Sequence, residues 1–198
     1  MTTVYAAASM SLDGYVSGPA EAGFDQLFDW YGNGDVEVTT ADPALTMRLR
    51  EPSAQVFRQL LQETGALVVG RKTFDLTDGW GGRHPIGCPV VVLTHQVPEG
   101  WPRPDAPFTF VTDGIEPAVA TARQLAGDRL VGVSGGSIAR QCLDAELLDE
   151  IRIDLVPVLL GGGTPFFDHL RTAPVVLDGP SPVIEGDRVT HLRYRVRR

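Results

Sequence analysis

The chain has 198 residues, of which 43% are hydrophobic and 21% charged, a composition typical of globular proteins and sufficient for one good core. Its 25 acidic and 17 basic residues give a net charge of -8, which argues against a broad nucleic-acid-binding surface. The two cysteines, Cys88 and Cys142, form no CxxC pair, so we expect buried thiols rather than a disulfide framework, and no metal site. No apolar run reaches 18 residues and no basic leader precedes the first apolar stretch, so we expect a soluble, cytoplasmic protein.

The chain opens with a strand, a loop and a helix. Residues 2–9 form an apolar run of the length of a buried strand, and residues 10–19 are polar and read as a loop. Apolar side chains stand at helical spacing within 23–31, which predicts a helix there. Residues 32–52 carry glycines, prolines and charges without a clear period, which predicts a long loop.

Helices and strands then alternate along the middle of the chain. Ser53 is placed to cap a helix that Gly65 ends. The expected helices are 54–64, 115–127 and 136–147, and the expected strands are 66–70, 89–94, 107–112 and 129–134. This alternation predicts a mainly parallel sheet that helices cover on both faces.

The last part of the chain has three strand-like runs without helices between them, at 149–161, 173–179 and 188–198. In the last run apolar residues alternate with arginines, which indicates one buried and one solvated face. We therefore predict an α/β fold in which antiparallel strands complete a mixed, mostly parallel sheet. No linker, repeat or low-complexity tract divides the chain, so residues 1–198 are expected to form a single domain.

Residues 132–136 allow two interpretations. Gly132-Val133-Ser134-Gly135-Gly136 matches the G-x-S-x-G elbow that presents a nucleophilic serine in hydrolases. Such a site also needs an acid and a histidine later in the chain, for which the candidates are Asp154 or Asp168 with His169 or His191. In the second interpretation, the glycines leave free backbone amides at a helix N-terminus, where they would bind a phosphate.

A second strand-to-helix turn has features of a phosphate site. The apolar run 66–70 leads directly into Gly70-Arg71-Lys72-Thr73. Gly70 lets a ligand approach the backbone, Thr73 offers a hydroxyl and an amide, and Arg71 or Lys72 supplies positive charge. Two such turns could bind one long ligand; the alternative is that both cations are simply solvated.

Three stretches together resemble a known family: SMSLDGYVSG at 9–18, VVGRKTF at 68–74 and VSGGSIARQCLDAELLDEIRIDLVPVLLGGGTPFF at 133–167. They resemble the dihydrofolate reductase-like family, in particular the branch related to the reductase domain of bacterial riboflavin biosynthesis. The resemblance implies a three-layer fold with a central mixed sheet of about eight strands that binds NADPH across the carboxyl ends of its strands. It also implies a homodimer.

The resemblance further implies a set of cofactor-binding residues. Arg71 would lie near the 2′-phosphate, the turn at 94–96 would complete the adenosine phosphate pocket, and the glycine pair would bind the pyrophosphate. Ser134 would then be a turn residue. The full set is Ser9, Val16, Gly70, Arg71, Lys72, Thr73, Thr94, His95, Gly135, Gly136, Ser137 and Ile138.

On the substrate side, the resemblance points to acidic residues. Folate reductases carry a carboxylate on the first helix, and Asp29 is the nearest candidate here, with Asp25 one turn earlier; both also fit a solvated helix face. Asp13 is implied as a catalytic and substrate contact, although Asp13-Gly14 also fits a plain turn. Trp30 and Asp154 are the remaining substrate candidates.

These residues predict an NADPH-dependent reductase. It would transfer hydride to a C=N or C=O bond of a small heterocyclic substrate, such as a pteridine or an aminopyrimidine, with 5-amino-6-(5-phosphoribosylamino)uracil reductase activity as the family's example. Two alternatives remain open: a serine hydrolase that uses Ser134, and an NADPH-binding protein without turnover.

Overall fold

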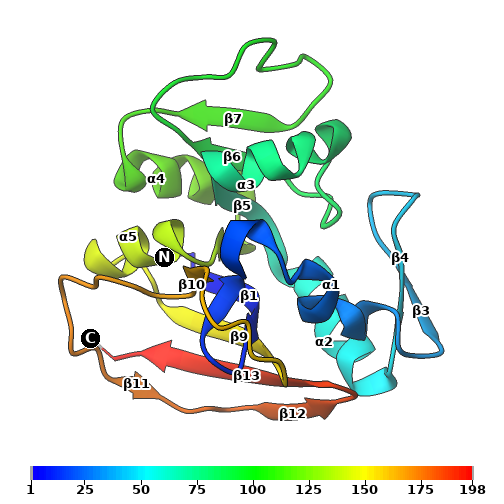
Figure 1. Ribbon diagram of the computed structural model, residues 1–198. Coiled ribbons are helices and arrows are strands. Elements are labelled where there is room, and N and C mark those ends of the chain that lie inside the picture. Colours follow the sequence, from blue (N-terminus) through cyan, green and yellow to red (C-terminus); the bar gives the residue numbers. More distant parts are fainter. Residues whose placement is uncertain (1, 198) are drawn as a thin grey trace.

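The computed structural model describes residues 2–197, and a central sheet runs through them (Figure 1). Met1 and Arg198, at the ends of the expected domain, lie outside the described residues. The strands of the sheet are β1 (Val4–Ser11), β5 (Thr64–Gly70), β6 (Val90–Leu93), β7 (Phe108–Val111), β8 (Leu130–Ser134), β9 (Glu150–Val156), β11 (Leu177–Asp178), β12 (Val183–Gly186) and β13 (Val189–Val196). Their order is β11-β13-β9-β1-β8-β5-β6-β7, and β12 pairs with β13.

Most neighbours in this sheet are parallel. The pairs from β9 through β1, β8, β5 and β6 to β7 all run in the same direction. By contrast, β13 is antiparallel to β9, and β11 and β12 are antiparallel to β13. The predicted mixed sheet with antiparallel C-terminal strands is therefore confirmed. Because parallel strands end at the same edge, the loops after β1, β5, β6 and β8 meet there, which is where open α/β sheets bind ligands.

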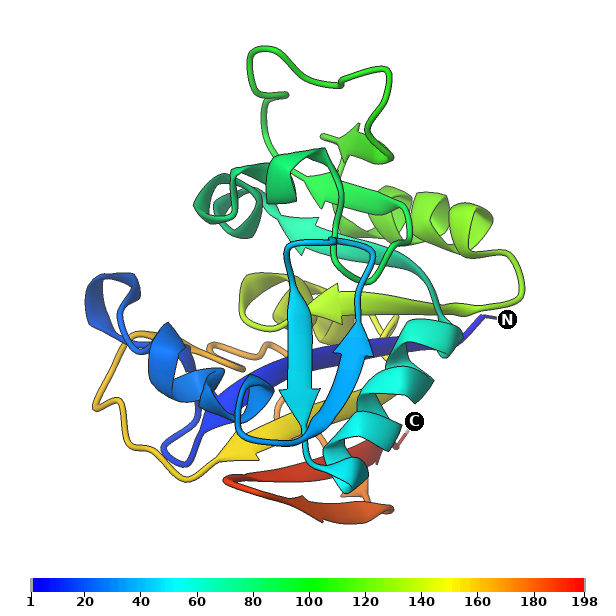
Figure 2. The same cartoon turned by 90° about the vertical axis from the view of Figure 1, so that its right-hand side faces the viewer.

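Helices cover both faces of the sheet, as predicted (Figures 1 and 2). On one face, α4 (Ile115–Ala126) and α5 (Ser137–Asp144) pack against the strands, and Val91 points into that core. On the other face lie α2 (Glu51–Glu63) and α3 (Arg71–Leu76), and Val90 and Val92 pack there with Phe74 of α3. Strands that are buried on both faces read as continuous apolar runs, which is why they could be identified in the sequence.

The stretch 32–52 is not a long loop, so this prediction was wrong. It contains a two-stranded hairpin formed by β3 (Val36–Thr39) and β4 (Thr46–Leu49), which stands beside α2 in Figure 2. Its inward side chains Val38, Met47 and Leu49 are buried in a separate core with Trp30 and Phe57. The hairpin therefore covers the sheet face on the α2 side.

Helix α2 also begins earlier than predicted. Arg50 occupies the N-cap, Pro52 lies in the first turn, and Ser53 is inside the helix, where its hydroxyl bonds His191 instead of capping. Gly65 belongs to β5 instead of ending the helix. A glycine is needed at this position because a side chain would collide with the backbone of Ala126.

The remaining differences concern short elements. The helix expected within 23–31 is one turn of α-helix, α1 (Phe24–Leu27), followed by a 3-10 turn at Asp29–Tyr31. Strand β9 ends at Val156, before Pro157, and β12 and the small β2 (Tyr15–Ser17) to β10 (Thr164–Pro165) pair were not predicted. Both cysteines are free and buried, as expected. Among residues 2–197, none of the helices has the length and apolar character needed to cross a bilayer.

Candidate functional site

The two turns that the sequence singles out lie side by side. Strands β5 and β8 are parallel neighbours, with Val68 opposite Val133, so the turns that follow them reach the same edge of the sheet. A Cβ atom at Gly70 would lie 3.4 Å from Cγ1 of Ile138 in the first turn of α5. The end of β5 is therefore in contact with the start of α5, and one extended ligand could reach both turns.

The turn before α5 forms a backbone hollow, which we call the glycine hollow (Gly135, Gly136, Ser137 and Ile138). Gly136 is the N-cap of α5 with φ 73°, a conformation that favours glycine, and no side chain caps this helix. A Cβ atom at Gly135 would lie 3.2 Å from Cγ1 of Val16 and 3.3 Å from Cβ of Ala8. The Gly136 amide itself donates to the carbonyl of Phe166 at 3.0 Å, so the amides that follow it, in the first turn of α5, are the ones placed for a phosphate group. The residues present therefore fit a dinucleotide cofactor here.

Arg71 connects two neighbouring loops. Its Nη1 donates to the carbonyl of Gln96 at 3.0 Å, in the turn after β6, while its Nε donates to Asp75 at 2.7 Å. The Thr94 hydroxyl donates to the same carbonyl of Gln96 at 2.8 Å. The structure thus brings Arg71 together with the 94–96 turn, in which His95 is exposed.

The other residues of the turn after β5 have different positions. Lys72 is exposed and forms an ion pair with Glu21, which follows β2 in the chain. Thr73 is half-buried and its carbonyl accepts a hydrogen bond from the Thr77 hydroxyl at 3.0 Å. Of the two cations considered at this turn, Arg71 is the one that bridges to the next loop.

Asp13 holds two loops together at the carboxyl edge of the sheet. Its Oδ1 accepts hydrogen bonds from the Ser11 hydroxyl at 2.6 Å and the Leu160 amide at 3.1 Å, and its Oδ2 accepts from the Gly161 amide at 2.7 Å. The hydrogen bond from Ser11, followed by those from the backbone amides, holds the pKa of Asp13 below its usual value, against a smaller opposing effect of burial. The carboxylate therefore anchors the loop after β1 to the loop after β9, and its catalytic role stays a prediction.

A row of polar residues crosses the sheet face under α2. Ser9 of β1 pairs in register with Asp154 of β9, and Asp154 pairs with His191 of β13, so the three side chains share one face. Trp30 packs over this row: its indole Nε1 donates to the Ser9 hydroxyl at 3.3 Å, and its ring centroid lies 5.2 Å from that of His191. The structure thus brings together Ser9, Trp30 and Asp154, which the sequence singled out separately.

Two further residues join Asp154 in what we call the polar chain (Ser53, His191 and Asp154). Nδ1 of His191 lies 2.7 Å from Oδ1 of Asp154, and Nε2 of His191 lies 2.9 Å from the Ser53 hydroxyl. Asp154 and His191 were already candidates from the sequence for an acid and a histidine acting with Ser134. Ser53 was missed as their partner, because it read as a helix cap and stands 138 positions from His191. The only local signal is a histidine in a strand whose other polar residues are mostly arginines.

Asp29 and Asp25 lie outside this row. Asp29 forms an ion pair with Arg188 at 3.0 Å, and the two side chains are 53% and 60% exposed. Asp25 is also exposed. An exposed pair of this kind contributes little to stability, and neither side chain presents a buried carboxylate next to Ser9 or Trp30. The prediction that Asp29 is catalytic finds no support in this arrangement.

The geometry around Ser134 does not favour a serine hydrolase. Ser134 is the last residue of β8 and lies outside the left-handed backbone region, whereas a nucleophile elbow is a strained turn. Both ring nitrogens of His191 are engaged by Asp154 and Ser53. In addition, β1 and β9 lie between β8, which carries Ser134, and β13, which carries His191. At the usual strand spacing the two strands are roughly 14 Å apart, too far for a hydrogen bond between these residues.

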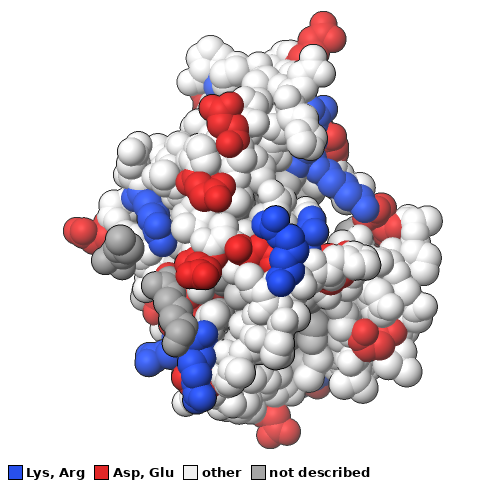
Figure 3. Space-filling view, turned by 90° about the vertical axis from the view of Figure 1, so that its left-hand side faces the viewer, with Lys and Arg blue, Asp and Glu red and all other residues white. Residues whose placement is uncertain are grey.

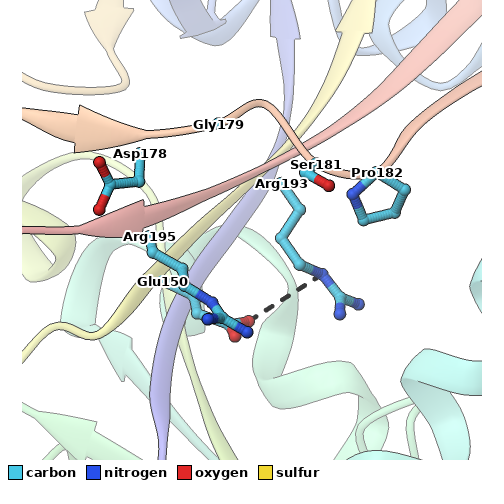
Figure 4. Close-up of a pocket in the computed structure, with 7 residues that line it drawn as sticks. All are labelled: Glu150, Asp178, Gly179, Ser181, Pro182, Arg193 and Arg195. Atoms are coloured by element: carbon cyan, nitrogen blue, oxygen red, sulfur yellow. Dashed lines mark ion pairs between the residues drawn. The ribbon is translucent and has the colours of Figure 1, made fainter.

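One face of the molecule carries mixed charge, and one cavity lies away from these turns. Acidic and basic side chains are interspersed on the face shown in Figure 3. A cavity of about 450 Å³ lies beside β13 and the 178–182 segment, where Arg193 Nε is 4.0 Å from Glu150 Oε2 (Figure 4). It contains none of the residues predicted to bind cofactor or substrate. Residues 2–197 include no cluster of three or more His, Cys, Asp or Glu side chains that could bind a metal ion.

Relatives with solved structures share this fold. A putative riboflavin biosynthesis protein from Shewanella sp. PV-4 has 24% identity and a TM-score of 0.72, with both chains covered completely. Dihydrofolate reductase from Enterococcus faecalis, solved with NADP(H) and RAB-propyl, has 16% identity and a TM-score of 0.57 over 99% of this chain and 97% of its own. RibD from Acinetobacter baumannii has 14% identity and a TM-score of 0.65 over all of this chain, which spans 58% of RibD.

Comparisons of sequence agree with the fold. The uncharacterized protein YwjB of Bacillus subtilis is 22% identical over 169 residues, which are 85% of this chain and 83% of YwjB. The model of the RibD C-terminal domain matches residues 2–177. That match takes in the loop after β1, both strand-to-helix turns and the Asp154 strand, and so the chain belongs to the RibD C-terminal domain family.

Proposed function

We propose that this protein is an NADPH-dependent reductase that acts on a C=N or C=O bond of a small heterocycle. One observation carries the proposal: Gly70 contacts Ile138, so the turn with Arg71 and the glycine hollow open on one edge of the sheet. Family membership and the fold shared with a dihydrofolate reductase solved with NADP(H) support it. When bound, the nicotinamide supplies the hydride, and the protein supplies orientation and a suitable electrostatic environment.

Each group of residues has a proposed task. The amides of Ser137 and Ile138 in the glycine hollow bind the pyrophosphate, because the Gly136 amide already donates to Phe166, and Val16 shapes the neighbouring space, since it lies against Gly135. Arg71, with Thr94 and His95 in the next turn, binds the 2′-phosphate, because a guanidinium can donate two hydrogen bonds to a phosphate. Asp154, which is partly exposed, faces the substrate on the α2 side, and the buried Ser9 and Trp30 support it from β1 and from above the row.

A titration with NADPH, followed by nicotinamide fluorescence, tests the proposal. We expect saturable binding, and absence of binding at hundreds of micromolar would refute it. Arg71→Ala should weaken NADPH binding by about tenfold or more, equivalent to about 1.4 kcal/mol, and NADH binding much less, because only NADPH carries the 2′-phosphate.

Arg58→Ala is the matched control for Arg71→Ala. Arg58 also pairs with a carboxylate on a helix, Glu51, and is similarly exposed, but it lies on α2 away from the carboxyl edge. It should leave both affinities unchanged. An equal loss for NADPH and NADH in Arg71→Ala would contradict the assignment of Arg71 to the 2′-phosphate.

The substrate class is tested by turnover. A Thermotoga maritima protein with the same fold is described as a diaminohydroxyphosphoribosylaminopyrimidine deaminase and 5-amino-6-(5-phosphoribosylamino)uracil reductase, and this chain spans 57% of it. We propose 5-amino-6-(5-phosphoribosylamino)uracil as the first substrate to assay, with dihydrofolate as the second. Tight NADPH binding without oxidation by either compound would favour the alternative of a cofactor-binding protein without turnover.

A further inference from the structure

The polar chain is buried at its Ser53 end and partly exposed at its Asp154 end. Ser53 is 2% exposed, the His191 side chain is 6% exposed, and the Asp154 side chain is 29% exposed. His191 contacts Asp154 through Nδ1 and Ser53 through Nε2, so its ring is fixed from both sides. Among the described residues, the structure gives Asp154 a hydrogen bond at Oδ1 only, and Oδ2 makes none. Asp154 is therefore the one member of the chain that a ligand can reach.

A nucleophilic role for Ser53 does not fit this geometry, although serine, histidine and aspartate occur in the order of a catalytic triad. The backbone at Gly186, the last residue of β12, covers the Ser53 hydroxyl so closely that any side chain at Gly186 would collide with it. No acyl group could approach Ser53. The chain must therefore act at its Asp154 end.

Asp154 is well placed relative to the proposed cofactor site. It is paired with Ser9 on β1, and the glycine hollow follows β8 on the other side of β1. Two strand spacings, roughly 10 Å, separate β9 from β8, with β1 between them, so the carboxylate and the hollow lie near the same edge of the sheet. The indole of Trp30, which donates to the Ser9 hydroxyl, covers Ser9 on the α2 side, so Asp154 is the polar group of this row that stays accessible.

The groups around the polar chain are neutral or paired. Burial raises the pKa of Tyr31, and the charge of Asp154 raises it further, so this phenol stays protonated at neutral pH. Arg152 of β9 pairs with Glu63 of α2 and with Glu150, and Arg193 of β13 lies 4.0 Å from the same Glu150. These arginines are engaged by glutamates, and the nitrogen within hydrogen-bond distance of Asp154 is Nδ1 of His191.

We propose that Asp154 donates the proton that completes reduction of the substrate, and that His191, held by Ser53, is a positioning residue for it. This inference rests on the proposed function. As hydride adds to the carbon of the C=N or C=O bond, the π electron pair moves to the nitrogen or oxygen, and that atom takes the proton from the Asp154 carboxyl. Asp154 is left as a carboxylate, which the Nδ1–H of His191 stabilises, and it regains a proton from water through its exposed side.

The first experiment measures NADPH oxidation with 5-amino-6-(5-phosphoribosylamino)uracil and with dihydrofolate in the full chain. Asp154→Asn should lower kcat by about 10²- to 10⁴-fold, the usual contribution of a general acid, and leave the Kd for NADPH within about twofold. Asp187→Asn is the control, because Asp187 is an exposed carboxylate that pairs with Arg50. A kcat for Asp154→Asn within about threefold of the wild type would overturn the inference while the proposed function stands.

A matched pair of His191 variants tests the positioning role. His191→Asn keeps an N–H donor near the place of Nδ1, whereas His191→Gln keeps one only near Nε2. We expect His191→Gln to lose kcat by up to about 10²-fold, as for a catalytic group misplaced by about 1 Å, and His191→Asn to recover much of it. The pH profile of kcat should move to higher pH in His191→Gln, because the carboxylate form loses its donor. Equal losses in both variants with an unchanged pH profile would contradict a positioning role.

A measurement on the wild type keeps the inference testable even if a variant fails to fold. The ¹⁵N signals of His191 should show Nδ1 protonated toward Asp154, and adding NADP⁺ with 5-amino-6-(5-phosphoribosylamino)uracil should shift the Nδ1 signal without turnover. No shift on binding would overturn the inference. If the wild type neither binds nor oxidises NADPH, the proposed function fails and the inference fails with it. If the wild type is active and Asp154→Asn keeps its kcat, only the inference fails.

Discussion

Asp13 and Asp154 are two carboxylates that differ in their hydrogen-bond partners and in how accessible they are. Asp13 accepts three hydrogen bonds, two of them from backbone amides, and so serves as an anchor. Asp154 has one partner, His191, and an accessible edge. Both are aspartates near the carboxyl edge of the sheet, and only their hydrogen-bond partners distinguish them.

The anchor at Asp13 predicts a pH dependence. Its pKa is lower in the folded protein than in the unfolded chain, chiefly because the Ser11 hydroxyl donates to it. Its contribution to stability is therefore complete above the unfolded value of about 4 and is lost as the pH falls through the folded value. Protection of the Leu160 and Gly161 amides from hydrogen exchange, relative to the unfolded chain at the same pH, should be constant from neutral pH to about pH 5 and decrease below about pH 4.

Asp13→Asn is the control for this experiment. It removes the ionisation, so protection of the two amides should be weaker and no longer change with pH in the acidic range. Protection that persists unchanged in the wild type to about pH 3 would contradict the anchoring role.

Among the elements, the start of α5 sets the size of the cofactor site. A Cβ atom at Gly135 would lie 3.2 Å from Cγ1 of Val16 on β2 and 3.3 Å from Cβ of Ala8 on β1, closer than ordinary packing, so any side chain there displaces these neighbours or enters the hollow. Gly135→Val should weaken NADPH binding by at least about tenfold, since overpacking of this kind costs about 1–3 kcal/mol. The measurement is the NADPH fluorescence titration.

Gly32→Ala is the control for Gly135→Val, because an added Cβ at Gly32 would meet only the carbonyl of Asp29, at 3.9 Å. It should bind NADPH like the wild type. Comparable affinities for Gly135→Val and the wild type would show that the hollow does not contact the cofactor.

The elements differ in how far the sequence predicts them. Strands such as β5 and β6 are buried on both faces and form unbroken apolar runs, so they and the helices between them could be located. The β3–β4 hairpin was missed because each strand alternates over only four residues, with Pro43 and Asp42 between them. Its partners, Trp30 and Phe57, come from other elements, and no local pattern records that packing.

The candidate site shows the same limit. The turns after β5 and β8 are local and were found from glycines and charges near a strand end. The polar chain joins residues 37 and 138 positions apart, and it depends on which register β9, β13 and α2 adopt. Register is decided by the whole sheet, so the roles of Ser53 and His191 emerge only in the folded structure.

At the scale of the whole molecule, the C-terminal strands offer a surface for self-association. Val176, Leu177 and Val183 are exposed beside or within β11 and β12, which lie at the open side of the sheet next to β13. Exposed strand edges with apolar side chains readily pair with a second copy. We therefore expect a homodimer through these strands.

Light scattering coupled to size-exclusion chromatography tests this expectation. The wild type should elute with twice the mass of one chain, and Val183→Lys should shift it toward the monomer, because a buried lysine would be unpaired at the interface. Val97→Lys, at an exposed valine in the loop after β6, is the control. A wild type that remains monomeric at micromolar concentration would contradict the expectation.

The row formed by Ser9, Asp154 and His191 also constrains how the gene can vary in length. Each side chain of the row lies on the α2 face only because β1, β9 and β13 pair in one exact register. Inserting or deleting a single codon within β9 or β13 would turn the affected side chain to the α4–α5 face and separate the acid from its histidine. The tip of the β3–β4 hairpin holds no side chain of this row in register. Natural length variation should therefore accumulate at that tip and be absent from β9 and β13.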